Sequence, residues 1–183
     1  MRNFFMVLIL VGLSLSGGRE TQAQFSTPYE LQEAVEEGDF SEVRNLMAKC
    51  RCPNTRNGDG TPILVLAATQ GNRDIAGYLM ENGANPNATG RENGLSALMA
   101  FAERGNRAGI ELMLNNGANI DAGDATGETA LIKAVRARAN SIVQLLLEQG
   151  ADIMMPDYQG RTALDHARNL RNRRLVGILE QAR

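Results

Sequence analysis

The sequence predicts an all-α fold made of a repeated helix–turn–helix unit. Two kinds of landmark recur with a period of 33 or 34 residues. They are the glycines Gly94, Gly127 and Gly160 and the related segments 83–87, 117–121 and 150–154. Between them lie pairs of short stretches with apolar residues at helical spacing, such as 129–136 and 141–149. Helices this short are marginal alone, so neighbouring units must stack on one another, and the repeat is the folding unit.

The N-terminal segment, residues 1–23, is expected to be a cleaved signal peptide. A singly basic start precedes the 12-residue apolar run Phe4–Leu15, and small or polar residues follow it. A helix needs about 20 apolar residues to cross a bilayer, so an export signal is favoured over a membrane anchor. Cleavage after Ala23 would leave residues 24–183 as the mature domain, without membrane insertion. The signal is bacterial in style, which predicts a periplasmic or secreted protein.

The composition argues against several classes of function. With 19 basic and 21 acidic residues the formal net charge is −2, so the chain lacks the positive field on which nonspecific nucleic-acid binding relies. One histidine and two cysteines cannot supply a His-rich or four-thiolate metal site. No glycine-rich phosphate loop is present. We therefore expect no nucleic-acid partner and no cofactor.

Within each unit, a short motif precedes the first helix, a turn joins the two helices, and a glycine follows the second. The motifs are Thr61-Pro62, Ser96-Ala97-Leu98, Thr129-Ala130-Leu131 and Thr162-Ala163-Leu164, the turns are Gly71-Asn72 and Gly105-Asn106, and the endings begin at Gly83, Gly117 and Gly150. This pattern resembles the ankyrin repeat and covers nearly all of the mature chain. The resemblance implies a solenoid of about five units joined by β-hairpin-like loops. The units are an N-terminal cap at about 26–56, repeats at 57–89, 90–122 and 123–156, and a C-terminal cap at 157–183.

The landmarks have physical reasons, and three departures from the pattern stand out. Threonine suits the N-cap of each first helix, and the final glycine closes each second helix in a left-handed conformation. Thr61-Pro62 lies one residue farther from its alanine pair than usual, and the loop 88–93 is one residue longer than its siblings. Phe101 occupies a slot that normally holds a small alanine. We expect altered helix packing at Phe101.

Cys50 and Cys52 form a possible disulfide. Cys50 aligns with Gly83, the position of a helix-ending glycine. Cysteines separated by one residue close only a small, strained ring, and strained disulfides are the redox-active ones. The alternative is a local staple in an exported end unit, because no base, resolving cysteine or redox fold accompanies the pair.

His166 is the single histidine, and no serine nucleophile or set of metal ligands lies at an interpretable spacing from it. We expect a partly buried residue that is held by a neighbouring carboxylate, and no enzymatic activity.

The resemblance implies that loop tips and first helices line a concave face, where ankyrin proteins usually hold partners. The matching positions are Asp59, Glu92, Asn93, Thr126, Tyr158 and Gln159 on loops, and Gln70, Glu103, Arg104, Arg136 and Asn169 on first helices. Tyr158 and the arginines rank highest, because Tyr and Arg dominate binding hot spots.

These observations predict a monomeric, non-catalytic module that binds another protein. One alternative is a dedicated inhibitor or immunity protein that neutralises a toxin or hydrolase. The other is a thiol redox protein that uses Cys50 and Cys52.

Overall fold

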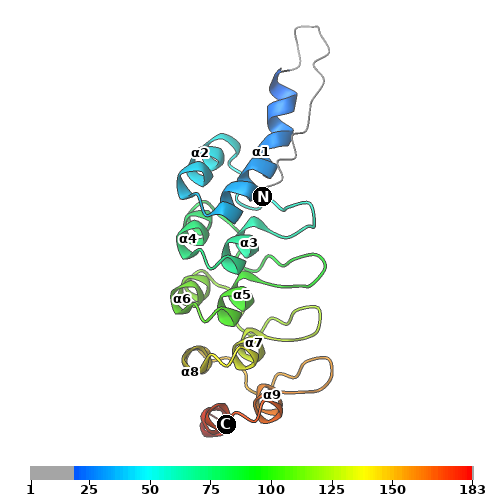
Figure 1. Ribbon diagram of the computed structural model, residues 1–183, viewed down its shortest axis with the longest axis vertical. Coiled ribbons are helices and arrows are strands. Elements are labelled where there is room, and N and C mark those ends of the chain that lie inside the picture. The colour runs from blue at the N-terminus through cyan, green and yellow to red at the C-terminus, as the bar shows by residue number, and fades with distance from the viewer. Residues whose placement is uncertain (1–18, 183) are drawn as a thin grey trace, which may run out of the picture.

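The computed structural model describes residues 19–182, so residues 1–18, most of the expected signal peptide, lie outside the described residues. The described part is a row of helix pairs (Figure 1). The helices are α1 (Arg19–Glu37), α2 (Phe40–Cys50), α3 (Ile63–Thr69), α4 (Arg73–Glu81), α5 (Ala97–Glu103), α6 (Arg107–Asn115), α7 (Ala130–Arg136), α8 (Asn140–Glu148), α9 (Ala163–Asn169) and α10 (Arg173–Gln181). The expected cleavage point after Ala23 falls within α1.

The odd-numbered helices stack in one layer and the even-numbered helices in a second (Figure 1). A continuous apolar core runs between the layers, and includes Leu31, Leu64, Leu98 and Leu131. The loops between successive pairs project from the odd-numbered layer, on the side away from the even-numbered helices. The predicted all-α solenoid is confirmed. No helix within residues 19–182 is long and apolar enough to span a membrane.

Hydroxyl side chains start three of the four odd-numbered helices that follow a loop. Ser96, Thr129 and Thr162 each accept a hydrogen bond from a backbone amide in the first turn of α5, α7 and α9. In α3 the N-cap is Pro62, which has no capping side chain, and the expectation that Thr61 caps this helix is wrong. Thr61 instead belongs to the preceding loop, where its carbonyl accepts from the amide of Asn57.

The ends of the even-numbered helices follow the expectation in three repeats and depart from it in the first. Gly83, Gly117 and Gly150 have φ values of +88°, +81° and +87°, in the left-handed region that favours glycine. Cys50, however, is the last residue of α2, and Arg51 takes the left-handed conformation with φ +49°. The alignment of Cys50 with a helix-ending glycine is therefore wrong by one residue. Helix α2 is two residues longer than α4, but its left-handed residue, Arg51, follows the helix directly, whereas Asn82 separates α4 from Gly83.

The loops between units are hairpin-like. An isolated antiparallel bridge joins Arg56 to Pro62, and a second joins Thr89 to Ser96. In the last two loops the amides of Asp124 and Asp157 donate to carbonyls four residues ahead, at 3.0 Å and 2.9 Å. These short turns bring side chains at each loop base close to the following helix.

Candidate partner-binding site

All eleven residues that the sequence placed on the partner-binding face are exposed. The helix positions cluster at the C-terminal ends of the odd-numbered helices. Glu103, Arg136 and Asn169 are the last residues of α5, α7 and α9, and Gln70 and Arg104 immediately follow α3 and α5. Together with the projecting loops, these ends form one side of the stack, which we call the loop face.

A pocket of about 310 Å³ lies on the loop face between the last two repeats, and we call it the arginine pocket. Its lining residues are Thr126, Glu128, Arg136, Asp157, Gln159, Arg161 and His166. The sequence predicted Thr126, Arg136 and Gln159 as contact residues. Glu128, Asp157 and Arg161 were not predicted.

Asp124 organises the loop that precedes α7. Its Oδ1 accepts from the amide of Thr126 at 2.8 Å and from the amide of Glu128 at 3.0 Å. Its Oδ2 lies 2.7 Å from Nζ of Lys133. Burial alone would raise the pKa of Asp124, but these bonds, led by that from Lys133, outweigh it and lower the pKa below the usual 3.8.

Glu128 is a buried residue of the pocket lining and lies between two cations. Lys133 Nζ approaches its Oε2 at 3.1 Å, and Arg136 donates from Nη1 to both carboxylate oxygens. Lys133 thus bridges Glu128 and Asp124. Burial would lower the pKa of Lys133, but its two carboxylate partners raise it above 10.5. The repeat-four part of the pocket is therefore a fully paired charge network.

Asp157 plays the corresponding role before α9. Its Oδ1 accepts from the amides of Gln159 and Arg161 at 2.9 Å, and its Oδ2 lies 2.9 Å from Nε2 of His166. The guanidinium of Arg161 donates to the same Oδ2 from Nε and Nη2. Burial would raise the pKa of Asp157, but the Arg161 amide, His166 and the Arg161 guanidinium hold it far below 3.8. Asp157 is thus the carboxylate that holds the buried His166.

Glu128, Asp157 and His166 each place one potential metal-ligand atom within 4.8 Å of the others. The carboxylates are already paired with Lys133, Arg136 or Arg161, so a metal ion would have to displace a cation from them. Because Glu128 comes from the fourth repeat and the other two from the fifth, this cluster spans the boundary between two repeats.

Two family models match the chain. One, described as ankyrin repeats (3 copies), matches residues 82–157, and the other, described as ankyrin repeat, matches residues 59–91. Together they cover residues 59–157, more than half of the 183 residues. The chain belongs to the ankyrin-repeat family. Ankyrin repeats are protein–protein interaction modules and are generally non-catalytic.

An ankyrin repeat-containing protein of Treponema pallidum (strain Nichols) is similar over part of its length. It is 33% identical over 88 residues, which are 48% of this chain and 30% of the relative. The match therefore spans less than a third of the relative, which is a much longer protein.

Tyr158 lies in the last ankyrin loop, in sequence between Asp157 and Gln159, which both line the arginine pocket. It is 79% exposed, and its amide donates to the carbonyl of Thr126 in the neighbouring loop at 3.0 Å. A Cβ at Gly127 would lie 2.7 Å from Cδ1 of Tyr158, so the ring rests against a residue that must be small. The fourth and fifth loops therefore hold this ring in place.

The Arg104 side chain contacts the preceding repeat, which the sequence did not indicate. Its Nε donates to the carbonyl of Thr69, and its side chain packs against Gly71 of the preceding ankyrin repeat. Its replacement would loosen a contact between repeats as well as change the loop face.

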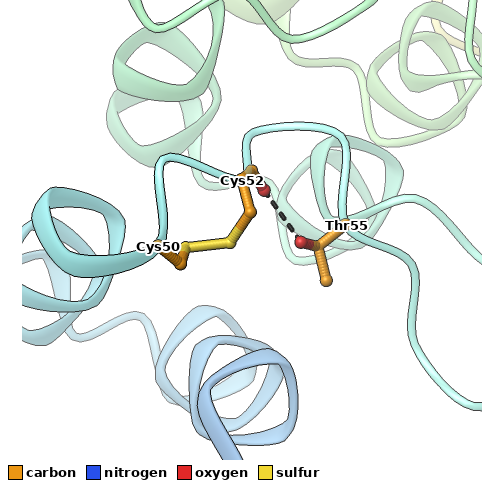
Figure 2. The surroundings of a disulfide bond; sticks show 3 residues. All are labelled: Cys50, Cys52 and Thr55. Carbon is orange, nitrogen blue, oxygen red and sulfur yellow. Dashed lines mark hydrogen bonds between the residues drawn. A yellow bond between two sulfur atoms is a disulfide. The ribbon is translucent and has the colours of Figure 1, made fainter. Parts of the chain in front are cut away.

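Cys50 and Cys52 are joined by a disulfide at the N-terminal end of the ankyrin stack, far along the row from the arginine pocket. Figure 2 shows that the bond links the end of α2 to the loop that carries Thr55. The Thr55 hydroxyl donates to the carbonyl of Cys52 at 2.8 Å. Both cysteines are partly buried.

The acidic residues at the centre of the site had a signal in the sequence. Asp124 and Asp157 are 33 residues apart, and each lies three residues before a loop glycine, Gly127 or Gly160. This repeated aspartate marks the base of the last two loops. The partner of His166 was harder to find, because Asp157 is nine residues away while Asp165 is adjacent.

Proposed function

We propose that this protein is an exported ankyrin-repeat module of the bacterial periplasm, which binds another protein through its loop face and has no catalytic activity of its own. The main supporting observation is the group of exposed residues in and next to the arginine pocket. The exposed Tyr158 stands in sequence between Asp157 and Gln159 of the pocket lining, and Arg136 and Arg161 of that lining are half-exposed guanidiniums fixed by buried carboxylates. Residues of this kind provide most of the binding energy in protein interfaces.

Two observations support export. The apolar run Phe4–Leu15 after a basic start fits a secretory signal. The Cys50–Cys52 disulfide fits an oxidising compartment. Cell fractionation, with mass spectrometry of the mature N-terminus, tests this part. A periplasmic product that begins at Gln24 is expected, and an unprocessed cytoplasmic chain would contradict it.

Partner capture tests the binding function. The full chain, carrying a C-terminal affinity tag, is expressed in its source bacterium and recovered from envelope extract. The test variant carries Tyr158→Ala and Gln159→Ala, because neither side chain forms a hydrogen bond among the described residues. The control variant carries Arg107→Ala and Glu111→Ala, an exposed ion pair on α6 in the even-numbered layer.

We expect one stoichiometric partner that the control variant retains and the test variant loses. Equal capture by both variants would remove the loop face from the proposal. A tight, exclusive partner that is a toxin or hydrolase, and is inactive in the complex, would favour a dedicated inhibitor over a general scaffold.

The disulfide supports thiol redox chemistry as a second candidate function. Cys50 and Cys52 are flanked by Lys49 and Arg51, and basic neighbours favour the reactive thiolate. A Cys50→Ser variant separates the two candidates. Partner binding that persists in this variant favours the interaction module. Redox chemistry is favoured instead if the folded variant loses thiol exchange and neither it nor the unmodified protein binds a partner.

A further inference from the structure

The charges around the arginine pocket balance in number but not in exposure. The buried carboxylates Asp124, Glu128 and Asp157 have side-chain exposures of 6%, 6% and 2%. Among the cations opposite them, Arg136 is 53% exposed and Arg161 is 39% exposed. The cluster thus hides its anions and presents its cations. A partner that approaches the pocket meets a positive surface, although the cluster has little net charge.

Both guanidiniums have N–H donors that form no hydrogen bond within the described residues. Arg136 uses Nη1 for Glu128, and Arg161 uses Nε and Nη2 for Asp157. Nε and Nη2 of Arg136, and Nη1 of Arg161, make no hydrogen bond within residues 19–182. Since both arginines line the same pocket, three donor atoms remain for a ligand. A planar fork of N–H donors matches the geometry of a carboxylate.

The arginines are also held in place before any ligand arrives. Glu128 anchors Arg136 and is itself paired with Lys133. Asp157 anchors Arg161 and is fixed by two backbone amides, and its lowered pKa keeps it ionised at neutral pH. Side chains that are already ordered lose little entropy on binding, so their hydrogen bonds add more to affinity.

We propose that the arginine pocket recognises a carboxylate of the protein partner, presented by a Glu or Asp side chain or by a C-terminus. The polypeptide source rests on the proposed function and on Tyr158, which is exposed between Asp157 and Gln159 of the pocket lining and whose ring offers apolar contact area to a bound peptide. The carboxylate bridges the free donors of Arg136 and Arg161.

The test uses fluorescence anisotropy with the full chain and two end-capped peptide pools. The pools are identical except that one has Glu and the other Gln at fixed positions. Charge-assisted hydrogen bonds are stronger than neutral ones, so we expect the Glu pool to bind at least about 10-fold more tightly. A Gln pool with a free C-terminal carboxylate compares the two polypeptide sources, and sodium acetate is the small-carboxylate competitor.

Variants connect the preference to the pocket. In Arg136→Gln, Glu128 keeps Lys133, and in Arg161→Gln, Asp157 keeps His166 and its amides, so both variants retain partners for the buried charge. Each variant removes one of the two guanidiniums that the carboxylate must bridge, so both should bind the two pools within about 2-fold of one another. Arg136→Lys, which preserves the charge without the planar fork, should keep part of the preference. Arg107→Gln, on α6, should keep all of it. Circular dichroism confirms that each variant is folded.

Equal binding of the Glu and Gln pools to the unmodified protein would overturn the proposal, as would an unchanged preference in folded Arg136→Gln and Arg161→Gln. Full displacement of the Glu pool by acetate at an equal carboxylate concentration would overturn the polypeptide source. Capture of a partner through Tyr158 without a Glu preference leaves the proposed function intact and refutes only the carboxylate. A Glu preference without any captured partner refutes the proposed function instead.

Discussion

The ring of Phe101 fills the space that Gly109 leaves on the neighbouring helix. Phe101 is fully buried in α5, and a Cβ added to Gly109 of α6 would lie 2.4 Å from its Cδ1. At the same helix positions the other repeats have alanine on the first helix and a large aliphatic residue on the second. Those pairs are Ala67 with Ile75, Ala134 with Ile142, and Ala167 with Leu175. The third repeat has exchanged the large and small positions, and α5 keeps the seven residues of its siblings.

This exchange predicts strong coupling between the two residues. Phe101→Ala should cost about 3–5 kcal/mol in the free energy of unfolding, because it opens a cavity in the core. Gly109→Ile should also destabilise, by about 1–3 kcal/mol or more, because the new side chain meets the ring. The double variant restores the arrangement of the sibling repeats and should lose much less than the sum. Urea unfolding followed by circular dichroism measures all four proteins, and additive losses would contradict the coupling.

Phe101 also illustrates what the sequence could predict and what it could not. Its slot stood out because four repeats could be compared, so a packing change was the reasonable expectation. The compensating Gly109 lies eight residues away on another helix, and only the relative position of the two helices connects them. The same reasoning explains the errors at Cys50 and Thr61. Periodicity places a residue in a repeat, but helix ends shift by one residue without changing the period.

The loop-face site was also only partly predictable from the sequence. Exposure of the loop and helix-end residues followed from the repeat pattern alone. The charge network did not, because it brings Glu128 of one repeat within 4.8 Å of Asp157 and His166 of the next, across turns whose geometry the sequence does not specify. A satisfied ion cluster depends on distances of a few ångströms, whereas the pattern gives only the order of the elements.

A ladder of side chains that connects successive repeats predicts a stabilising substitution at Asp121. Asn87 donates from Nδ2 to the carbonyl of Gly117 at 3.1 Å, and its Oδ1 accepts from the amide of Asn119 at 2.7 Å. Asp121, at the matching position, accepts from the amide of Asp152 but has no N–H to donate. Asp121→Asn should therefore add a hydrogen bond to Gly150 and stabilise the protein by about 0.5–1.5 kcal/mol.

Urea unfolding at neutral pH measures this gain. The reverse change, Asn87→Asp, removes the donor from an intact rung and should destabilise by a similar amount. A gain from both substitutions would contradict the ladder, because Asn87→Asp removes the same donor bond that Asp121→Asn is expected to create.

A missing helix cap in the fourth repeat predicts a second stabilising change. Asn72, Asn106 and Asn172 cap α4, α6 and α10 through their side chains, while Ala139, the N-cap residue of α8, provides no such bond. Ala139→Asn should stabilise by about 1 kcal/mol. The thermal unfolding midpoint reports the change. Asn172→Ala is the matched control and should lose about as much. A neutral Ala139→Asn would show that the bond from the Ile142 amide to the Ala139 carbonyl, at 2.9 Å, already satisfies this helix end.

The disulfide is expected to act locally. It closes a ring around one residue, Arg51, which has a left-handed φ of +49°. A short loop gains little from cross-linking, so reduction should cost less than about 2 kcal/mol. Hydrogen exchange with mass spectrometry in dithiothreitol should show faster exchange at the end of α2, with α5–α10 unchanged.

Arg51→Gly provides the matched variant for this test. Glycine adopts the left-handed conformation without a Cβ penalty, so the variant should lose less protection on reduction than the unmodified protein. Faster exchange that extends to the last two repeats would contradict a local role and would favour a redox switch that acts on the whole stack.

As the pH falls, the last two repeats are expected to lose stability at a higher pH than the second repeat. Asp124, Asp157 and Asp165 have pKa values below 3.8 in the folded protein, because the bonds from Lys133, Arg161, His166 and Thr162 favour the ionised carboxylates. A carboxylate whose pKa is lower folded than unfolded stabilises the fold above the unfolded pKa, and this stabilisation is lost as the pH falls through the folded pKa. Stability should thus decline below about pH 4.

The second loop provides an internal control. Asn57, at the position of Asp124 and Asp157, accepts from the amides of Asp59 and Thr61 at 3.1 Å and 2.8 Å but does not titrate. Hydrogen exchange between about pH 6 and pH 3, corrected for the intrinsic rates, should show protection lost first in α7–α10, and uniform loss across all repeats would contradict the assignment. Asp157→Asn should reduce the pH dependence at α9, because it removes one titrating group while keeping an oxygen that can accept from the amides of Gln159 and Arg161.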